Sequence, residues 1–309
     1  MTALAPHPVS APPARGAGHV LAPLFVTAFA AAAVYALYRV FVLTSLGQTV
    51  DTAALHGADV SHARAVEIMN RALNGTTLVS LVLVCLAAAA IGVLRRRIGL
   101  AVGAAVMVLG ANLSARLLKI RLERPDLDGF PLPNSFPSGH TTAAVSVAFA
   151  LVLVLPSAIR GMVSLIGAAY VSIIAVATVW AEWHRPSDTV AAMLLVLAWG
   201  GLISTVLRIK RLRIPGWMER RSRFATLLFL ISGAVTGAAG LLGLSAVALS
   251  ERVTPDLVSG RFAFLTGTAL ILAAVAGTFL IWTRLAAGDS PASPEAVPAE
   301  ADGNADADR

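Results

Sequence analysis

Long apolar stretches recur along this chain, and they restrict its fold more than any other feature. A helix needs about 20 mostly apolar residues to cross the roughly 30 Å hydrocarbon layer of a bilayer. The chain is 57% hydrophobic and only 13% charged, whereas soluble domains carry about 25% charged residues. We therefore expect an all-α, polytopic transmembrane helical bundle. The apolar runs place its spans at residues 20–44, 73–94, 98–118, 140–158, 161–182, 188–207, 224–249 and 262–283.

The charges between these runs indicate how the chain crosses the membrane. Arg95, Arg96 and Arg97 separate the second and third expected spans, and a basic segment at 208–223 separates the sixth and seventh. Because short cytoplasmic loops are enriched in Lys and Arg, we expect both termini in the cytoplasm. Topology thus accounts for the formal net charge of +7, and we expect no nucleic-acid partner.

Composition divides the chain into segments. Residues 1–19 are rich in Pro and Ala and residues 284–309 are acidic, which predicts a disordered cytoplasmic N-terminus and a disordered acidic C-terminal tail. Between them we expect a six-span core at 20–207, a basic cytoplasmic loop at 208–223 and two additional spans at 224–283. The additional spans carry no ionisable residue at their centres, which favours packing or partner contact as their role.

Polar residues gather in three short segments at the ends of apolar runs: KIRLERP at 119–125, FPSGHTT at 136–142 and HRPSD at 184–188. The expected topology puts all three on the outer side of the membrane. Their basic residues run against the positive-inside bias, and ionisable groups that are kept close to hydrocarbon usually have a function. Together the segments supply the groups needed to hold a phosphate and to transfer it through a histidine.

The middle segment opens an apolar run with Ser138, Gly139 and His140. Exposed backbone N–H groups at a helix N-terminus favour an anion there, and the serine adds a hydroxyl donor. Pro, Ser and Gly are also ordinary helix-capping and turn residues. The capping interpretation alone does not account for a histidine at the same place.

His184 and Asp188 are four residues apart, which places them on one face of a helix. A carboxylate that binds one imidazole nitrogen fixes the tautomer and leaves the other nitrogen as a nucleophile or base. An interfacial His followed by an Asp at a helix start is the simpler alternative. Lys119 and Arg124 flank a helix end at Pro125, either as a phosphate clamp or as side chains that snorkel to the interface.

The three segments resemble the type 2 phosphatidic acid phosphatase superfamily, which includes lipid phosphate phosphatases and is related to vanadium haloperoxidases. Its pattern is Lys-x6-Arg-Pro, then Pro-Ser-Gly-His, then Ser-Arg-x5-His-x3-Asp. The resemblance implies that His184 forms a phosphohistidine, that Asp188 orients it and that His140 protonates the leaving alkoxide. It also implies that the phosphoryl oxygens are held by Lys119, Arg124, Ser138 and the N–H of Gly139.

Two departures from this pattern concern the cations. Lys119 and Arg124 are separated by four residues instead of six, and the Ser-Arg pair falls on Ala177 and Thr178. We expect Arg185, next to the nucleophile, to supply the missing charge. The alternative is that Arg185 binds lipid headgroups or Glu182.

We therefore expect an integral membrane phosphatase that acts on a lipid phosphate or pyrophosphate at the outer face of the plasma membrane, with no metal and no cofactor. A phosphotransferase would pass the same phosphoryl group to an alcohol instead of water. A haloperoxidase would bind vanadate, although a chain buried in a bilayer suits a lipid substrate better. A non-enzymatic transporter or scaffold with a degenerate site is a further alternative. A transporter would more often place ionisable residues at mid-membrane, whereas the cluster here is at one interface.

Overall fold

The computed structural model describes residues 18–58, 67, 71, 86–87, 90–131, 133–210, 222–253 and 257–289. Every regular element in these residues is a helix, which confirms the expected all-α bundle. The helices are α1 (Gly18–Leu37), which continues as the π-helix η1 (Tyr38–Val42), α2 (Ser45–His56), α5 (Ile98–Arg121), α6 (Gly139–Val154), α7 (Ser157–Trp180), α8 (Pro186–Lys210), α9 (Arg223–Val253) and α10 (Gly260–Asp289).

Six of these helices are long and apolar enough to cross a membrane: α1 with η1, α5, α7, α8, α9 and α10. Helix α6, expected to span from 140 to 158, ends at Val154 and is too short to count with them. It stops there because Leu155 precedes Pro156, and the residue before a proline disfavours the helical backbone. Of the expected span at 73–94, only residues 86–87 and 90–94 lie within the described part.

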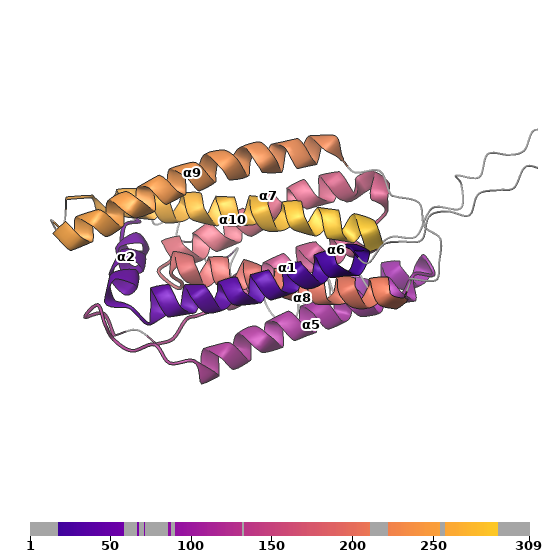
Figure 1. The fold of residues 1–309 in the computed structure, drawn as a ribbon, viewed down its shortest axis with the longest axis horizontal. Coiled ribbons are helices and arrows are strands. Elements are labelled where there is room, and N and C mark those ends of the chain that lie inside the picture. Colours follow the sequence, from indigo (N-terminus) through magenta and orange to yellow (C-terminus); the bar gives the residue numbers. More distant parts are fainter. Residues whose placement is uncertain are drawn as a thin grey trace, which may run out of the picture.

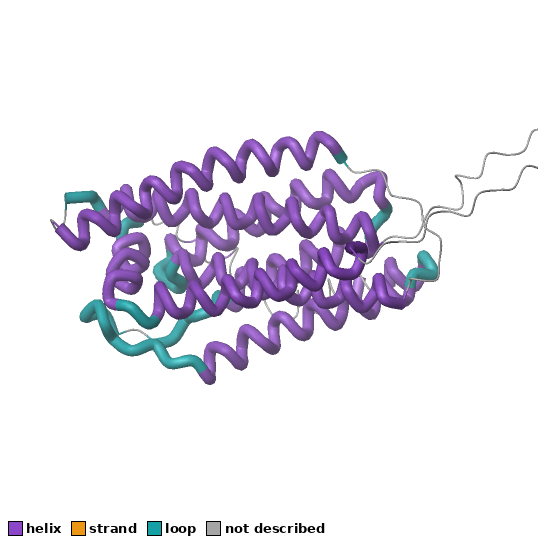
Figure 2. Tube along the Cα trace, in the orientation of Figure 1, coloured by secondary structure: helices purple, strands orange, loops and turns teal. Residues whose placement is uncertain are grey.

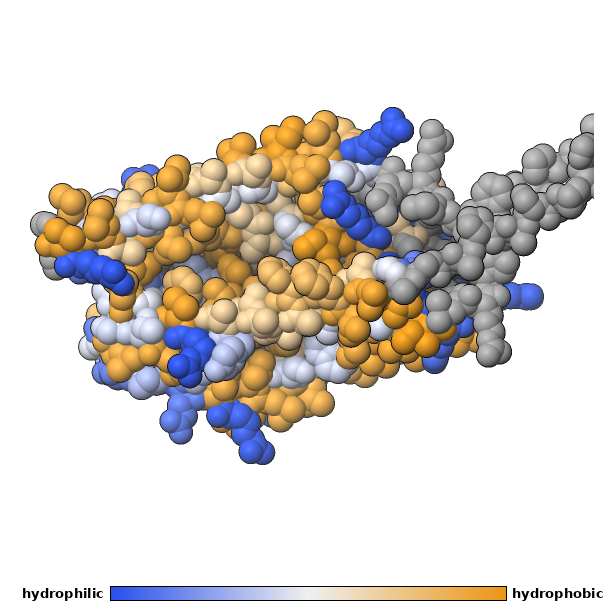
Figure 3. Space-filling view, viewed as in Figure 1, coloured by the Kyte–Doolittle hydropathy of each residue, from blue (hydrophilic) through white to orange (hydrophobic). Residues whose placement is uncertain are grey.

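The long helices run side by side along one axis, with the loops at the two ends (Figures 1 and 2). Helix α8 contacts α1, α5, α6 and α10, so it lies at the centre of the bundle. Helices α9 and α10 form an antiparallel pair along one side. Figure 3 shows hydrophobic residues over the flanks and most strongly hydrophilic residues toward the ends, as a membrane helix bundle requires.

Helix α10 is built into the core of the bundle. The indole of Trp282 stacks on the ring of Phe149 from α6, with 4.9 Å between the ring centroids, and its Nε1 donates a hydrogen bond of 3.0 Å to the carbonyl of Phe149. The ring of Phe279 meets Phe149 edge-on at 5.1 Å. The two C-terminal spans therefore belong to the same folded unit as the helices that carry the candidate site.

The basic end of the bundle also has a structural use for its arginines. Arg208 donates to the carbonyls of His19 (2.9 Å) and Leu285 (2.8 Å), and thus joins the start of α1 to the last turns of α10. With Leu285 and Ala286 buried, α10 continues to Asp289. Residues 284–289 are thus helical, although we expected the tail to be disordered from 284. Residues 1–17, 211–221 and 290–309 lie outside the described part.

Candidate active site

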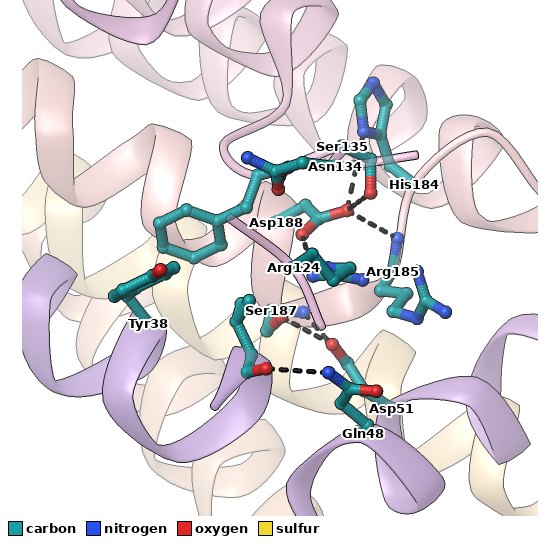
Figure 4. A network of polar contacts seen from close by, with 12 residues as sticks. Tyr38, Gln48, Asp51, Arg124, Asn134, Ser135, His184, Arg185, Ser187 and Asp188 are labelled. Carbon is teal, nitrogen blue, oxygen red and sulfur yellow. Dashed lines mark hydrogen bonds and ion pairs between the residues drawn. The ribbon is translucent and has the colours of Figure 1, made fainter. Parts of the chain in front are cut away.

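The three polar segments meet at one end of the bundle. KIRLERP covers the end of α5, FPSGHTT the start of α6, and HRPSD the turn between α7 and the start of α8. A backbone hydrogen bond joins the last two segments directly, because the N–H of Ser138 donates to the carbonyl of Asp188 at 2.9 Å. Figure 4 shows the side chains that surround Asp188.

The turn that carries His184 begins with a defined helix ending. After α7, the N–H of Glu182 donates to the carbonyl of Val179 (2.9 Å) and that of Trp183 to the carbonyl of Thr178 (3.0 Å), the bonding pattern of a Schellman motif. Glu182 has φ +58°, where glycine is usually found. The N–H of His184 also donates to the carbonyl of Thr178, at 3.1 Å. These bonds fix the backbone at the histidine.

Asp188 collects contacts from all sides of the site. One oxygen accepts from Nη2 of Arg124 at 3.0 Å. The other accepts from the hydroxyl of Ser135 and from the N–H of Arg185, the latter at 3.0 Å. Nδ1 of His184 lies 3.6 Å from this second oxygen, just beyond hydrogen-bond distance. The carboxylate is fully buried, so its negative charge must be stabilised by these partners.

His184 and Asp188 therefore lie side by side, but not on one helix face as their spacing predicted, because His184 belongs to the turn before α8. Nδ1 of His184 is buried and has no hydrogen-bond partner among the described residues. A shift of a few tenths of an ångström would complete its bond to Asp188, and such bonds are often long in ligand-free structures. Since Nδ1 faces the carboxylate, Nε2 is directed away from it and is the nitrogen free to react.

At the start of α6, the sequence FPSGHTT both caps the helix and leaves backbone open for an anion. The hydroxyl of Ser138 accepts from the N–H of Thr141 at 3.3 Å, so it caps the helix. A Cβ atom on Gly139 would contact no other atom within 4 Å, so the space beside the backbone is open there. The ring of His140 lies 6.3 Å from that of His184 and 5.4 Å from that of Trp183, measured between centroids. The two imidazoles are therefore neighbours, although His140 is not among the residues that line the adjacent pocket.

A pocket of about 310 Å³ opens at this place, lined by Leu55, Lys119, Pro133, Asn134, Ser135, Glu182, Trp183, His184 and Arg185. Lys119 and His184 thus face one space, although they are distant in sequence. Arg124 does not line this pocket, and its side chain, which binds Asp188, is only 3% exposed. Its Nε and Nη1 have no hydrogen-bond partner among the described residues. Unsatisfied buried donors are costly, and phosphate oxygens would satisfy them.

Arg185 has a different setting from the one expected. Its Nε donates to the hydroxyl of Thr52 at 3.1 Å, and its Nη2 lies 3.9 Å from the carboxylate of Asp128. In Figure 4 its side chain and that of His184 leave the turn in different directions. Glu182 has its contact with His56 instead, at 3.5 Å. The phosphate-binding role of Arg185 remains a prediction.

Sequence analysis did not identify the polar residues of α2 that support the site. Asp51 is buried and accepts from both the N–H (3.1 Å) and the hydroxyl of Ser187, one residue before Asp188. Burial and repulsion by Asp188 raise the pKa of Asp51 to about 7. Gln48, Asp51, Thr52 and Leu55 follow the i, i+3, i+4, i+7 spacing of one helix face, a pattern that could have indicated a buried polar stripe.

Metal ligands do not cluster at this end of the bundle. Within the described residues, no group of three or more His, Cys, Asp or Glu side chains is arranged to hold a metal ion. The cations that meet here, Lys119 and Arg124, are groups that suit an anionic ligand.

Comparison with known proteins relates the chain to one protein family. No curated protein and no solved structure matches the chain. A family model described as the PAP2 superfamily matches residues 17–212. This range is well over half of the chain and contains all three polar segments, while α9 and α10 follow it. The chain therefore belongs to the PAP2 superfamily, the type 2 phosphatidic acid phosphatases that the three segments resemble.

Proposed function

We propose that the protein is a membrane phosphatase that hydrolyses a lipid phosphate or pyrophosphate through a phosphohistidine on His184, without a metal ion. The observation that carries this proposal is the convergence of the three segments on Asp188. That carboxylate binds Arg124 and faces Nδ1 of His184, while His184 and Lys119 share one pocket. The phosphatase activity general in the PAP2 superfamily supports the same reaction.

In the first step, Nε2 of His184 attacks the phosphorus atom and the bond from phosphorus to the lipid oxygen breaks. His140 gives its proton to the departing oxygen, so that a neutral alcohol leaves. Asp188 stabilises the positive charge that develops on the phosphorylated imidazole. Lys119 and Arg124 balance the negative charge on the phosphoryl oxygens in the transition state.

In the second step, a water molecule attacks the phosphohistidine. His140, now neutral, accepts a proton from this water as general base. The phosphorus–nitrogen bond breaks, inorganic phosphate leaves, and both histidines return to their starting protonation states. The hydrolysis therefore balances without an added redox partner or cofactor.

The proposed substrate and orientation follow from where the site lies in the bundle. The catalytic end is continuous with the hydrophobic flanks in Figure 3, so a lipid can stay in the bilayer while its phosphate enters. Arg95, Arg160 and Arg208 lie at the opposite end, each donating to a main-chain carbonyl of the helices that end there. The positive-inside rule supports an outward-facing site, and we propose that the membrane is the plasma membrane.

The test is phosphate release by the purified protein from phosphatidic acid, phosphatidylglycerol phosphate and a polyprenyl pyrophosphate. His184→Ala should lower turnover on the order of a thousandfold or more, because it removes the nucleophile. His56→Ala is the matched control, since His56 lies at the same end and contacts the exposed Glu182. Its activity should stay near that of the parent. Turnover near the parent rate by His184→Ala would refute the mechanism. Loss of activity on chelation, restored by Mg²⁺, would refute metal independence.

A further inference from the structure

A second cavity lies between the part of the chain that matches the family model and the two C-terminal spans. Its volume is about 230 Å³, and its walls come from α1, η1, α2, α8, α9 and α10. Most of the lining is apolar, including Phe41, Ala54, Leu244, Val247, Ala263 and Leu270. Figure 3 shows a hollow on this face of the bundle, between α1 and the α9–α10 pair.

This cavity is separate from the catalytic pocket. The two share no lining residue. Adjacent residues of α2 line different spaces, because Leu55 lines the catalytic pocket and Ala54 lines the cavity. In the same way, Arg185 lines the pocket while Pro186 and Ser187 line the cavity. The hydrogen bonds between Asp51 and Ser187 therefore lie in the wall between them.

Helix α10 touches the catalytic turn beside this cavity. A Cβ atom on Gly267 would lie 2.7 Å from Cγ of Pro186 and 3.4 Å from Cβ of Ala54. Only a glycine allows this close approach. Pro186 begins α8 and is two residues from both His184 and Asp188. A molecule that fills the cavity therefore contacts Pro186, in the segment that positions the nucleophile.

The chemistry of the walls indicates the occupant. An apolar cavity of about 150 Å³ stays dry and binds small apolar molecules, and this cavity is larger. Water would find few partners, because the polar side chains of the lining are only Asp51, Ser187 and Thr266, and both carboxylate oxygens of Asp51 already accept from Ser187. Leu241, at the rim, is 61% exposed on the flank of the bundle. The cavity therefore communicates with the region that lipid chains occupy.

We propose that this cavity binds one apolar chain of a membrane lipid other than the molecule being dephosphorylated, and that the bound chain supports the catalytic turn through Pro186. The C-terminal spans then provide a regulatory lipid site. Binding of the chain does not depend on the proposed phosphatase activity, whereas its effect on turnover rests on that function.

The binding test uses Leu244→Trp, which fills the cavity. Its matched control is Leu242→Trp on the same helix, where the leucine is 74% exposed and does not line the cavity. The protein is placed in phosphatidylcholine bilayers that contain phosphatidylcholine with a diazirine at the end of one acyl chain. After illumination, crosslinks are mapped on α10, with Leu265, which is 57% exposed, as the internal reference for ordinary lipid contact.

We expect labelling at Ala263, Thr266 and Leu270 in the parent and in Leu242→Trp. Leu244→Trp should reduce it about fivefold relative to Leu265, which corresponds to about 1 kcal/mol of binding free energy. A second filling variant, Ala263→Leu, applies if Leu244→Trp does not fold. Absence of labelling in the parent, or equal labelling in the filled variants, would overturn the proposal.

Competition distinguishes a regulatory lipid from the substrate. Replacing part of the unlabelled phosphatidylcholine with phosphatidic acid should leave the labelling relative to Leu265 unchanged, because the cavity recognises only the chain. Reduction by phosphatidic acid would show that the cavity holds the tail of the substrate, and would overturn the proposal. Phosphate release should fall in Leu244→Trp and not in Leu242→Trp. A parent with no turnover would refute the proposed function and leave the crosslinking result standing.

Discussion

Replacing Asp51 with asparagine tests the electrostatics behind the site. The carboxylate of Asp51 is buried, and its pKa is raised to about 7, first by burial and then by repulsion from Asp188. The two hydrogen bonds from Ser187 and the charge of Arg124 act in the opposite direction. Arg185 is a further cation whose charge interacts with Asp51. Asparagine keeps the shape of the side chain and removes the titration.

The sign of the effect follows from proton binding. Between pH 3.8 and about 7, the folded protein keeps a proton on Asp51 that the unfolded chain releases. The stability of the parent should therefore fall as pH rises through this window, by about 4 kcal/mol in total from this group. Asparagine does not incur this loss but weakens a hydrogen bond to Ser187, at about 1–2 kcal/mol. At pH 8 the variant should be the more stable protein, by about 2–3 kcal/mol.

The measurement is denaturant-induced unfolding of the purified protein in detergent micelles at pH 5, 6, 7 and 8. The difference in unfolding free energy between Asp51→Asn and the parent should grow with pH and level off above 7. Asp126→Asn is the control, because it removes a carboxylate that is exposed at the same end of the bundle. A difference between Asp51→Asn and the parent that does not change with pH would refute the reasoning.

Three further substitutions test the helix packing and the turn, each read out by the same unfolding measurement. Glu182→Gly should raise stability by about 1 kcal/mol, because Glu182 has φ +58° and glycine adopts that backbone without strain; an unchanged or lower value would contradict this. Trp282→Ala should cost about 3–5 kcal/mol, since the buried indole stacks on Phe149 and donates to its carbonyl, and a loss below 1 kcal/mol would argue against a core role for α10. Gln48→Ala should cost about 2–4 kcal/mol, because it removes bonds to the carbonyls of Val42 and Pro125 and to the N–H of Leu127; near-parent stability would show that water replaces them.

The membrane helices could be predicted because hydropathy and length are local properties of the sequence. Runs such as 98–118 and 188–207 lie within α5 and α8. The end of α6 could have been predicted from Pro156, but the expected span, which was based on hydropathy alone, extends to residue 158. The expected end of α10 is too early because the carbonyl of Leu285 in its last turns accepts a hydrogen bond from Arg208, which is distant in sequence.

In the candidate site, too, contacts between residues close in sequence could be predicted and contacts between distant residues could not. The proximity of His184 and Asp188 could be predicted from their spacing, although His184 lies in the turn before α8 and not on the helix. The structure also brings Arg124 to the same carboxylate. Asp51 is 136 residues from its partner Ser187, so no local pattern indicates the contact. Ser135 likewise reaches Asp188 only through the fold of the connection between α5 and α6.

The central claim is that His184 becomes phosphorylated during turnover. Its most direct test is rapid quenching of the protein with a lipid phosphate labelled on phosphorus, followed by mass spectrometry of the peptide that contains residues 181–192. We expect an acid-labile, alkali-stable phosphoryl group on His184 that forms and decays at rates consistent with turnover, and no label in His184→Ala. Label on another residue, or turnover at the parent rate by His184→Ala, would contradict the account.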